Sequence, residues 1–417
     1  MAIEQAVQRW GAYDRDDPFP LFAELRERGA VHAVTLADGH AAWLVVRYDE
    51  ARAALNDARL SKDMHAALAM DSGIVAEGLP GPAFARHMLS VDPPDHTRLR
   101  RLVSCVFTPR RVERLEPRVQ AIVDDLIDRI AALGPAARVD LVSTFAFPLP
   151  FTVICELLGV PEPERAPLGR ELGALLAPVS TPAEHERAQA ASDAVVSMLT
   201  ELVEFKTTAP GDDLVSGLVD ARDGDERLTQ QELLSTIFQL ILAGHDTTTS
   251  LIGNGVVALL RNPEQLAALR ADPSKLPAAV EELLRYDAPV PHSTFRYAVE
   301  PVELGGATIP AGAQVIICLA AANRDPARYD HPELLDIGRE EGRHLGFGHG
   351  IHHCLGAPLA RMEGVVAFGS LLRRFPQLQL AVPSDELHWG HGDGLVLRGL
   401  TELPVIPGPS ASTRSSR

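Results

Sequence analysis

The chain has 417 residues, of which 46% are hydrophobic, and a formal net charge of −17. This content is ample for a large core, and the negative charge argues against nucleic acid as a partner. The first 17 residues carry charges and no apolar run, so we expect no signal peptide and no membrane anchor. Four widely separated cysteines give no indication of a disulfide framework.

No linker, internal repeat or low-complexity interior divides the chain. We therefore expect one large domain over residues 18–406, after an N-terminal segment of residues 1–17. Residues 407–417 are rich in Pro, Ser and Arg, a composition that predicts a disordered tail.

The first elements are short. Residues 18–28 predict an amphipathic helix, and residues 31–36 and 42–46 predict strands around an Asp38-Gly39 turn. We expect Asp49 to cap a helix that runs to Leu55.

Residues 60–90 show no regular pattern but hold apolar residues, among them Met64, Leu68 and Leu89. A loop of this length inside a compact domain is usually functional or disordered. We interpret it as a lid or wall over a pocket; the alternative is a loop that only packs on the core.

His96 and Arg100 are four residues apart, so they lie on one face of a predicted helix. Such a face suits an anionic ligand, although a solvated basic face is the alternative. Further arginines on an acidic chain form a candidate docking patch for an acidic partner: Arg98, Arg101, Arg110, Arg111 and Arg114.

Four more helices are predicted at residues 115–133, 145–158, 162–176 and 183–206. Then Thr229 and Glu232 form a capping box that opens a long helix, which Asn262-Pro263 ends.

The middle of this long helix is rich in glycine and threonine, which weaken a helix. Leu240, Ala243, Gly244 and Thr247 fall on one face, and Asp246 points about a quarter-turn away. Such a run in the middle of a long helix needs a reason, and close packing of the helix through small residues is one.

Glu282 and Arg285 lie three apart on a predicted helix, as ordinary surface pairs often do. Residues 286–317 predict short strands, one of which carries Arg296. Val290, Pro291 and His292 come just before it, and near the C-terminus Leu395 and Val396 form an apolar pair among glycines.

The stretch from His344 to Arg361 is rich in glycine and ends at the start of a predicted helix. Cys354 sits at that helix start, where the helix dipole favours the thiolate, the form that binds metal. A zinc site lacks a second ligand pair, and a dinucleotide loop would need a third glycine where Ile351 stands.

The pattern Phe347-Gly348-x-Gly-x-His352-x-Cys354-x-Gly356 resembles the haem-binding loop of the cytochrome P450 monooxygenases, with every defining position filled. The resemblance implies a mainly α fold with a small β-rich lobe. It also implies haem b as the cofactor, with Cys354 as the axial thiolate ligand of the iron.

The resemblance further implies roles for the other motifs. His96, Arg100, Arg296 and His352 would hold the haem propionates, and Ala243 and Gly244 would line an oxygen-binding groove. Asp246 and Thr247 would relay protons. Glu282, Arg285 and Arg339 would form a structural network behind the haem. The expected substrate pocket consists of Met64, Leu68, Leu89, Leu240, Val290, Pro291, His292, Leu395 and Val396.

The function implied is insertion of one oxygen atom from O2 into a lipophilic molecule such as a macrolide, steroid or terpenoid. No flavin, nicotinamide or iron–sulfur fingerprint is present, so electrons would come from a ferredoxin and its NAD(P)H-dependent reductase. We expect a cytoplasmic monomer. A peroxide-using or coupling haem-thiolate enzyme and a non-enzymatic haem sensor are the alternatives.

Overall fold

The computed structural model describes residues 7, 10–11, 13–36, 39–63, 84–177, 179, 181–221, 226–340, 342–390 and 396–411. The chain forms two compact units, each built from separate stretches of sequence. The first unit comprises Met1–Leu60, Glu113–Pro150 and Asp246–Arg417, and the second comprises Ser61–Val112 and Phe151–His245. This interleaving is expected of one large domain rather than of consecutive domains.

The first unit contains a five-stranded sheet with the order β1-β2-β8-β5-β3. Its strands are β1 (Val31–Thr35), β2 (Ala41–Val45), β8 (Gln314–Ile317), β5 (Arg296–Ala298) and β3 (Leu60–Ser61). Strands β1 and β2 are antiparallel, whereas β2 and β8 are parallel.

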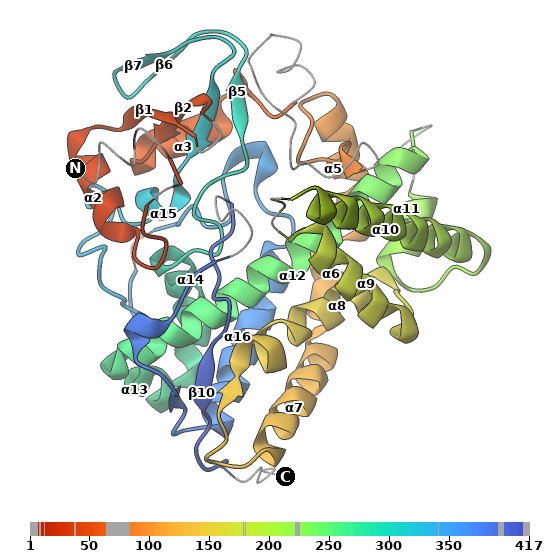
Figure 1. Ribbon diagram of the computed structural model, residues 1–417, viewed down its shortest axis with the longest axis vertical. Helices are drawn as coiled ribbons and strands as arrows, with labels where there is room; N and C mark the ends of the chain where they lie inside the picture. Colours follow the sequence, from red (N-terminus) through yellow and green to blue (C-terminus); the bar gives the residue numbers. More distant parts are fainter. Residues whose placement is uncertain are drawn as a thin grey trace. The chain divides into compact units, whose positions relative to one another are not determined.

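Side chains alternate across this sheet, because successive residues of a strand point to opposite faces. In β8, Val315 and Ile317 pack into a core that includes α3 (Tyr48–Asn56). Ile316, between them, packs into a second core that includes α2 (Phe19–Arg28). Figure 1 shows α2, α3, β1, β2 and β5 gathered in one part of the first unit.

The rest of the first unit is mainly helical. Helix α16 (Ala357–Arg374) packs on α7 (Glu116–Ala132) and on α14 (Leu276–Tyr286). The second half of α12 (Gln230–Arg261) also approaches α16 closely, since a Cβ on Gly255 would lie 2.5 Å from the Phe368 ring. The smaller elements are β4 (Val139–Asp140), η2 (Val142–Ala146), α13 (Pro263–Ala271), η3 (Pro273–Lys275), β6 (Val302–Leu304), β7 (Ala307–Ile309), α15 (Leu319–Ala322), η4 (Gly350–His352), β9 (Gln379–Leu380), η5 (Ser384–Glu386) and β10 (Pro404–Ile406).

The second unit is helical in its described part, apart from the edge residue Ser61. Helix α10 (Pro182–Thr208) packs on α9 (Glu162–Leu175) and α11 (Leu214–Asp220), and α11 packs on α5 (Asp95–Val106). Helices α6 (Pro109–Glu113) and α8 (Pro148–Leu158) overlap the borders of the unit.

Helix α12 has 32 residues and belongs to the second unit up to His245 and to the first unit from Asp246. Its length is about 48 Å at 1.5 Å per residue. The predicted capping box is confirmed: Glu232 N donates to Thr229 Oγ1 at 3.2 Å, and Thr229 N donates to Glu232 Oε2 at 2.9 Å.

The prediction that Asp49 caps a helix was wrong. Helix α3 is preceded by Arg47, so Asp49 lies inside the first turn and does not cap it. In the N-terminal segment, Trp10 is buried against Phe22. Residues 407–411 are ordered by backbone hydrogen bonds, including Ala411 N to Arg374 O at 2.9 Å. The rest of the predicted disordered tail lies outside the described residues.

Candidate functional site

Helix α5 of the second unit carries His96 and Arg100 one turn apart. His96 is 2% exposed, and Arg100 is partly buried. The sequence places both on one face because the helix runs uninterrupted between them. The second unit can therefore present two nitrogen donors side by side to an anionic group.

Three arginines of the predicted docking patch form ion pairs with carboxylates of the same unit. Arg98 binds the buried Glu232 carboxylate, while Arg101 lies 3.6 Å from Glu226 and Arg111 lies 3.0 Å from Asp212. These carboxylates, all within the second unit, offset much of the local positive charge. The docking patch for an acidic partner stays a prediction, and Arg101 remains about half exposed despite its ion pair.

The middle of α12 holds the predicted groove residues. In the second unit, Ala243 is exposed, whereas a Cβ on Gly244 would lie 3.0 Å from Ile154 of α8. Close packing through small residues therefore accounts for a glycine at position 244, and the groove role of Gly244 stays a prediction. In the first unit, Asp246 is buried and Thr247 is partly buried. The Asp246 carbonyl accepts a bond from Ser250 Oγ at 2.9 Å, a side-chain bond of the kind that bends helices.

The Cys354 loop is fixed by its backbone. Cys354 N donates to Phe347 O at 2.9 Å, which closes the loop just before α16 begins. Gly348 and Gly350 have φ of 71° and 75°, a region that other residues rarely adopt. A Cβ on Gly350 would also lie 2.7 Å from Oδ1 of Asn56, the last residue of α3. The two glycines thus let the loop turn tightly.

The Cys354 thiol is exposed, and it stands two residues before Gly356, the N-cap of α16. A Cβ on Gly356 would lie 3.8 Å from the sulfur, an ordinary van der Waals contact. His352 is partly buried in η4, just before the cysteine. The loop therefore presents an accessible sulfur at the positive end of a helix dipole, where a thiolate is favoured.

Arg296 in β5 is a buried cation of the same unit, with 4% exposure. Its guanidinium donates to the carbonyl oxygens of Leu60 and Leu55, each at 3.3 Å. Burying a cation is costly unless an anion compensates it, so the site suits a carboxylate ligand such as a propionate.

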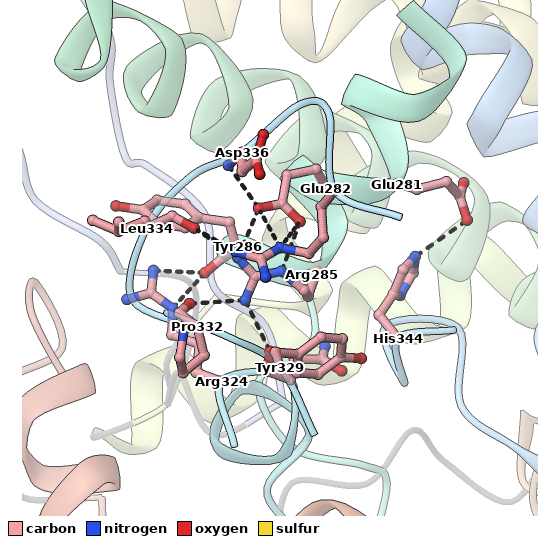
Figure 2. Close-up of polar contacts among 12 residues, drawn as sticks. Glu281, Glu282, Arg285, Tyr286, Arg324, Tyr329, Pro332, Leu334, Asp336 and His344 are labelled. Carbon is pink, nitrogen blue, oxygen red and sulfur yellow. Dashed lines mark hydrogen bonds and ion pairs between the residues drawn. The ribbon is translucent and has the colours of Figure 1, made fainter. Parts of the chain in front are cut away.

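The predicted structural network is present and buried (Figure 2). Arg285 donates to both oxygens of Glu282, each at 2.7 Å, and Arg339 Nε lies 3.3 Å from the same carboxylate. Arg285 also donates to the carbonyls of Asn323, Pro332 and Leu334. Arg285 therefore fixes the chain that leads from α15 towards the Cys354 loop.

This network reaches the ligand loop through Asn323. Arg285 Nη1 donates to Asn323 O at 3.0 Å, and Asn323 Oδ1 accepts a bond from Leu345 N at 2.7 Å. Leu345 lies directly before the glycine-rich turn. The sequence analysis did not identify Asn323, because no local pattern marks it.

The predicted pocket residues are only partly described. Met64, Leu68 and Leu395 lie outside the described residues. In the second unit, Leu89 and Leu240 are partly buried; in the first, Val290 and Val396 are partly buried and Pro291 is buried.

His292, a predicted pocket residue, does not face solvent. It is fully buried, and its ring packs edge-on against Trp10 and Phe22 at centroid distances of 5.6 and 6.0 Å. These aromatic partners come from the N-terminal part of the chain, and Trp10 lies in the segment that the sequence analysis placed outside the domain. They explain the burial of His292 without a ligand.

A buried acid that the sequence analysis missed is Glu363 of α16, 1% exposed. Burial raises the pKa of its carboxyl to about 8, although a hydrogen bond from Thr248 of α12 partly offsets this. The carboxyl is therefore mostly protonated at neutral pH. The sequence carries a signal for this burial. Glu363 lies four residues from Leu359 and four from Ala367, so it shares a helix face with two buried apolar residues.

Glu363 should make stability depend on pH. Its pKa is higher in the folded chain than the ordinary 4.5, so the folded state binds a proton that the unfolded state releases. The stability that protonated Glu363 contributes is fully present below pH 4.5 and is lost as the pH rises towards 8. We expect the free energy of unfolding of Glu363→Gln to depend less on pH than that of the parent. At pH 8 it should exceed the parent's value by a few kcal/mol.

The check is urea unfolding of both proteins from pH 5 to 8.5. Glu264→Gln, on the exposed surface of α13, is the control and should keep the parental profile. Parallel profiles for parent and Glu363→Gln would contradict the assignment.

Among the described residues, no cluster of three or more His, Cys, Asp or Glu side chains could hold a metal ion. Within that same part of the chain, no helix combines the length and hydropathy that crossing a bilayer requires. A haem needs only one axial protein ligand and charged groups for its propionates. Within the first unit, the exposed Cys354 thiol and the buried Arg296 cation fit that requirement.

Known proteins match this chain over nearly its whole length. Residues 174–397 match the family described as Cytochrome P450. The chain is 48% identical to the cytochrome P450 monooxygenase PikC of Streptomyces venezuelae, over 95% of this chain and 93% of that protein. It is 46% identical to the 6-deoxyerythronolide B hydroxylase of Saccharopolyspora erythraea, over 93% and 96%.

Among solved structures, the tirandamycin C-bound P450 monooxygenase TamI is 44% identical, covers 93% of this chain and 97% of its own, and gives a TM-score of 0.83. The match extends to the mainly helical architecture with small sheets, which confirms the predicted fold class. The chain belongs to the cytochrome P450 family of haem-thiolate monooxygenases.

Proposed function

We propose that this enzyme inserts one oxygen atom from O2 into a lipophilic natural product, such as a macrolide, steroid or terpenoid. The observation that carries the proposal is the adjacent acid and threonine, Asp246 and Thr247, in the middle of α12. Two relatives support the substrate class: one is named for hydroxylation of 6-deoxyerythronolide B, and another was solved with tirandamycin C.

The cofactor of this proposal is haem b, which when bound supplies an iron that binds and activates O2. Cys354 would donate its thiolate to the iron. Arg296, in the first unit, would balance the charge of one propionate. The family resemblance gives His352 a propionate-binding role as well. For His96 and Arg100 we keep the propionate-binding role that the family resemblance implies.

Proton delivery is the task we assign to α12. Thr247, partly buried, would hold a proton at its hydroxyl near the oxygen-binding position. Asp246, buried one residue earlier, would resupply that proton from the solvent side. A pocket that excludes water would keep these transfers directed to the reaction and not to side products.

The redox partner we propose is a ferredoxin with its NAD(P)H-dependent reductase, since the sequence holds no flavin or iron–sulfur fingerprint. The location we propose is the cytoplasm, and the expected assembly is a monomer.

The proposal is tested by screening lipophilic compounds against the haem-loaded enzyme for the spectral shift that follows displacement of iron-bound water. Compounds that bind are then incubated with a surrogate ferredoxin, its reductase, NAD(P)H and ¹⁸O2. We expect a product that has gained one ¹⁸O atom. A product formed only with hydrogen peroxide, or none from any tight-binding compound, would refute the proposal.

Thr247→Ala should leave substrate binding within about twofold but lower product formed per electron. A positioned proton donor contributes 10²–10⁴-fold to its step, so we expect coupling to fall by about tenfold or more. The measurement compares product, hydrogen peroxide and NAD(P)H consumed. Thr249→Ala, a buried position on the same helix, is the matched control. Equal coupling in both variants would mean that another group delivers the proton.

A further inference from the structure

Glu281 of α14 contacts both ends of the Cys354 loop. It precedes Glu282 of the structural network, but its carboxylate points to different partners (Figure 2). His344 Nε2, at the start of the loop, lies 3.3 Å from Glu281 Oε2. Arg361, in the second turn of α16, donates to Glu281 through Nε at 2.7 Å and Nη2 at 2.9 Å. One carboxylate thus connects two residues that lie on either side of Cys354 in the sequence.

The same two residues enclose the Phe347 ring. The Arg361 guanidinium lies 4.6 Å from the ring centre, and the His344 ring centre lies 5.8 Å from it. His344 Nδ1 also accepts a bond from Gly346 N at 3.0 Å. Phe347 in turn accepts the bond from Cys354 N through its carbonyl. A contiguous set of contacts therefore runs from Glu281 to the cysteine backbone.

The charges of Glu281 and Arg361 shift each other's pKa. Burial alone would raise the pKa of the Glu281 carboxyl, but hydrogen bonds from His344 and Arg361 outweigh it and lower the pKa to about 2. The bond to Glu281 raises the pKa of Arg361, and the nearby Cys354 adds to this effect. The carboxylate is thus ionised at any pH of interest, and it offsets the Arg361 charge close to the thiolate.

We propose that Glu281 is a positioning residue: it holds both ends of the ligand loop on α14 and offsets the Arg361 cation, and so sets the geometry and electrostatics of the Cys354 thiolate. The proposal rests on Cys354 as the haem ligand. It differs from the role of Glu282, which fixes the chain before the loop, because Glu281 contacts the loop itself.

The two functions of Glu281 can be separated by two substitutions. Glu281→Gln removes the negative charge and leaves Arg361 uncompensated, so the reduction potential of the haem should shift to more positive values. Arg361→Gln removes the positive charge, so the potential should shift to more negative values. Both variants weaken the contact between loop and helix, so both should lose the thiolate form on warming several-fold faster than the parent.

The experiment uses the haem-loaded proteins. The potential is measured by spectroelectrochemical titration, and the thiolate form by the red-shifted band of the ferrous carbon-monoxide complex over time. Asp128→Asn is the matched control: it removes the carboxylate that binds Arg374 at 2.9 Å, at the other end of the same helix α16. We expect this control to change neither quantity.

Shifts of opposite sign in the two variants would support the proposal, because a general loss of structure cannot produce them. Unchanged potentials, or shifts of the same sign, would refute it. The band of the parent protein tests the ligand assignment first, so failure of that assignment is distinguishable. If Glu281→Gln yields little haem-loaded protein, Glu281→Asp should restore the band and most of the parental potential.

Discussion

Cys354→Ser will leave a folded protein whose ferrous carbon-monoxide complex lacks the red-shifted band of a thiolate-ligated haem. The serine hydroxyl is nearly the same size, so the loop and its bond from residue 354 N to Phe347 O should persist. It is not ionised at neutral pH, however, and it cannot donate a thiolate to the iron. The loss is therefore one of chemistry and not of fold.

The effect on turnover should be large. Changing residues that only support a metal ligand typically costs 10–100-fold, so removal of the ligand itself should cost more than about 100-fold. Absorption spectroscopy and product assays measure the two effects. Cys105→Ser is the matched control, because Cys105 is also an exposed cysteine but lies on α5. A red-shifted band that survives in Cys354→Ser would remove the ligand assignment.

Local patterns made the ligand loop predictable. The glycines, His352 and Cys354 act within one short stretch, so their offsets alone carry the geometry. The capping box of Thr229 and Glu232 is equally local, and the structure places it at the start of α12. Helical periodicity placed most helices to within a few residues for the same reason.

Long-range partners were not predictable. His292 and Trp10 come from distant parts of the chain, and nothing in either segment indicates that their rings meet. Glu281 directly precedes Glu282, yet a single step around the helix gives it entirely different partners. The Ile154 side chain that a Cβ on Gly244 would meet belongs to another helix, and no local pattern indicates this neighbour. In each case the missing information was the tertiary neighbour.

The second large effect should come from replacing Arg285. Arg285 and Glu282 form an ion pair in the interior, and their side chains are only 2% and 4% exposed. Arg285→Met would leave the Glu282 carboxylate with Arg339 at 3.3 Å and the Asp336 N–H at 2.9 Å. It would also remove the Arg285 donor from three carbonyl groups, of which Leu334 O would keep a bond from Arg339. Removing one member of a buried ion pair typically costs 3–5 kcal/mol, so we expect a loss of about that size.

Arg285→Lys should fail almost as badly, because an ammonium cannot reproduce the planar fork that serves two carboxylate oxygens and three carbonyls together. Haem retention should fall before global unfolding, since Arg285 holds Asn323, and Asn323 holds the loop at Leu345. Urea unfolding and haem content after gel filtration measure the two effects. Arg374→Lys, whose partner Asp128 is exposed, should cost less than about 1 kcal/mol. If Arg285→Lys were as stable as the parent, charge alone would suffice, and the network would not depend on the geometry of the guanidinium.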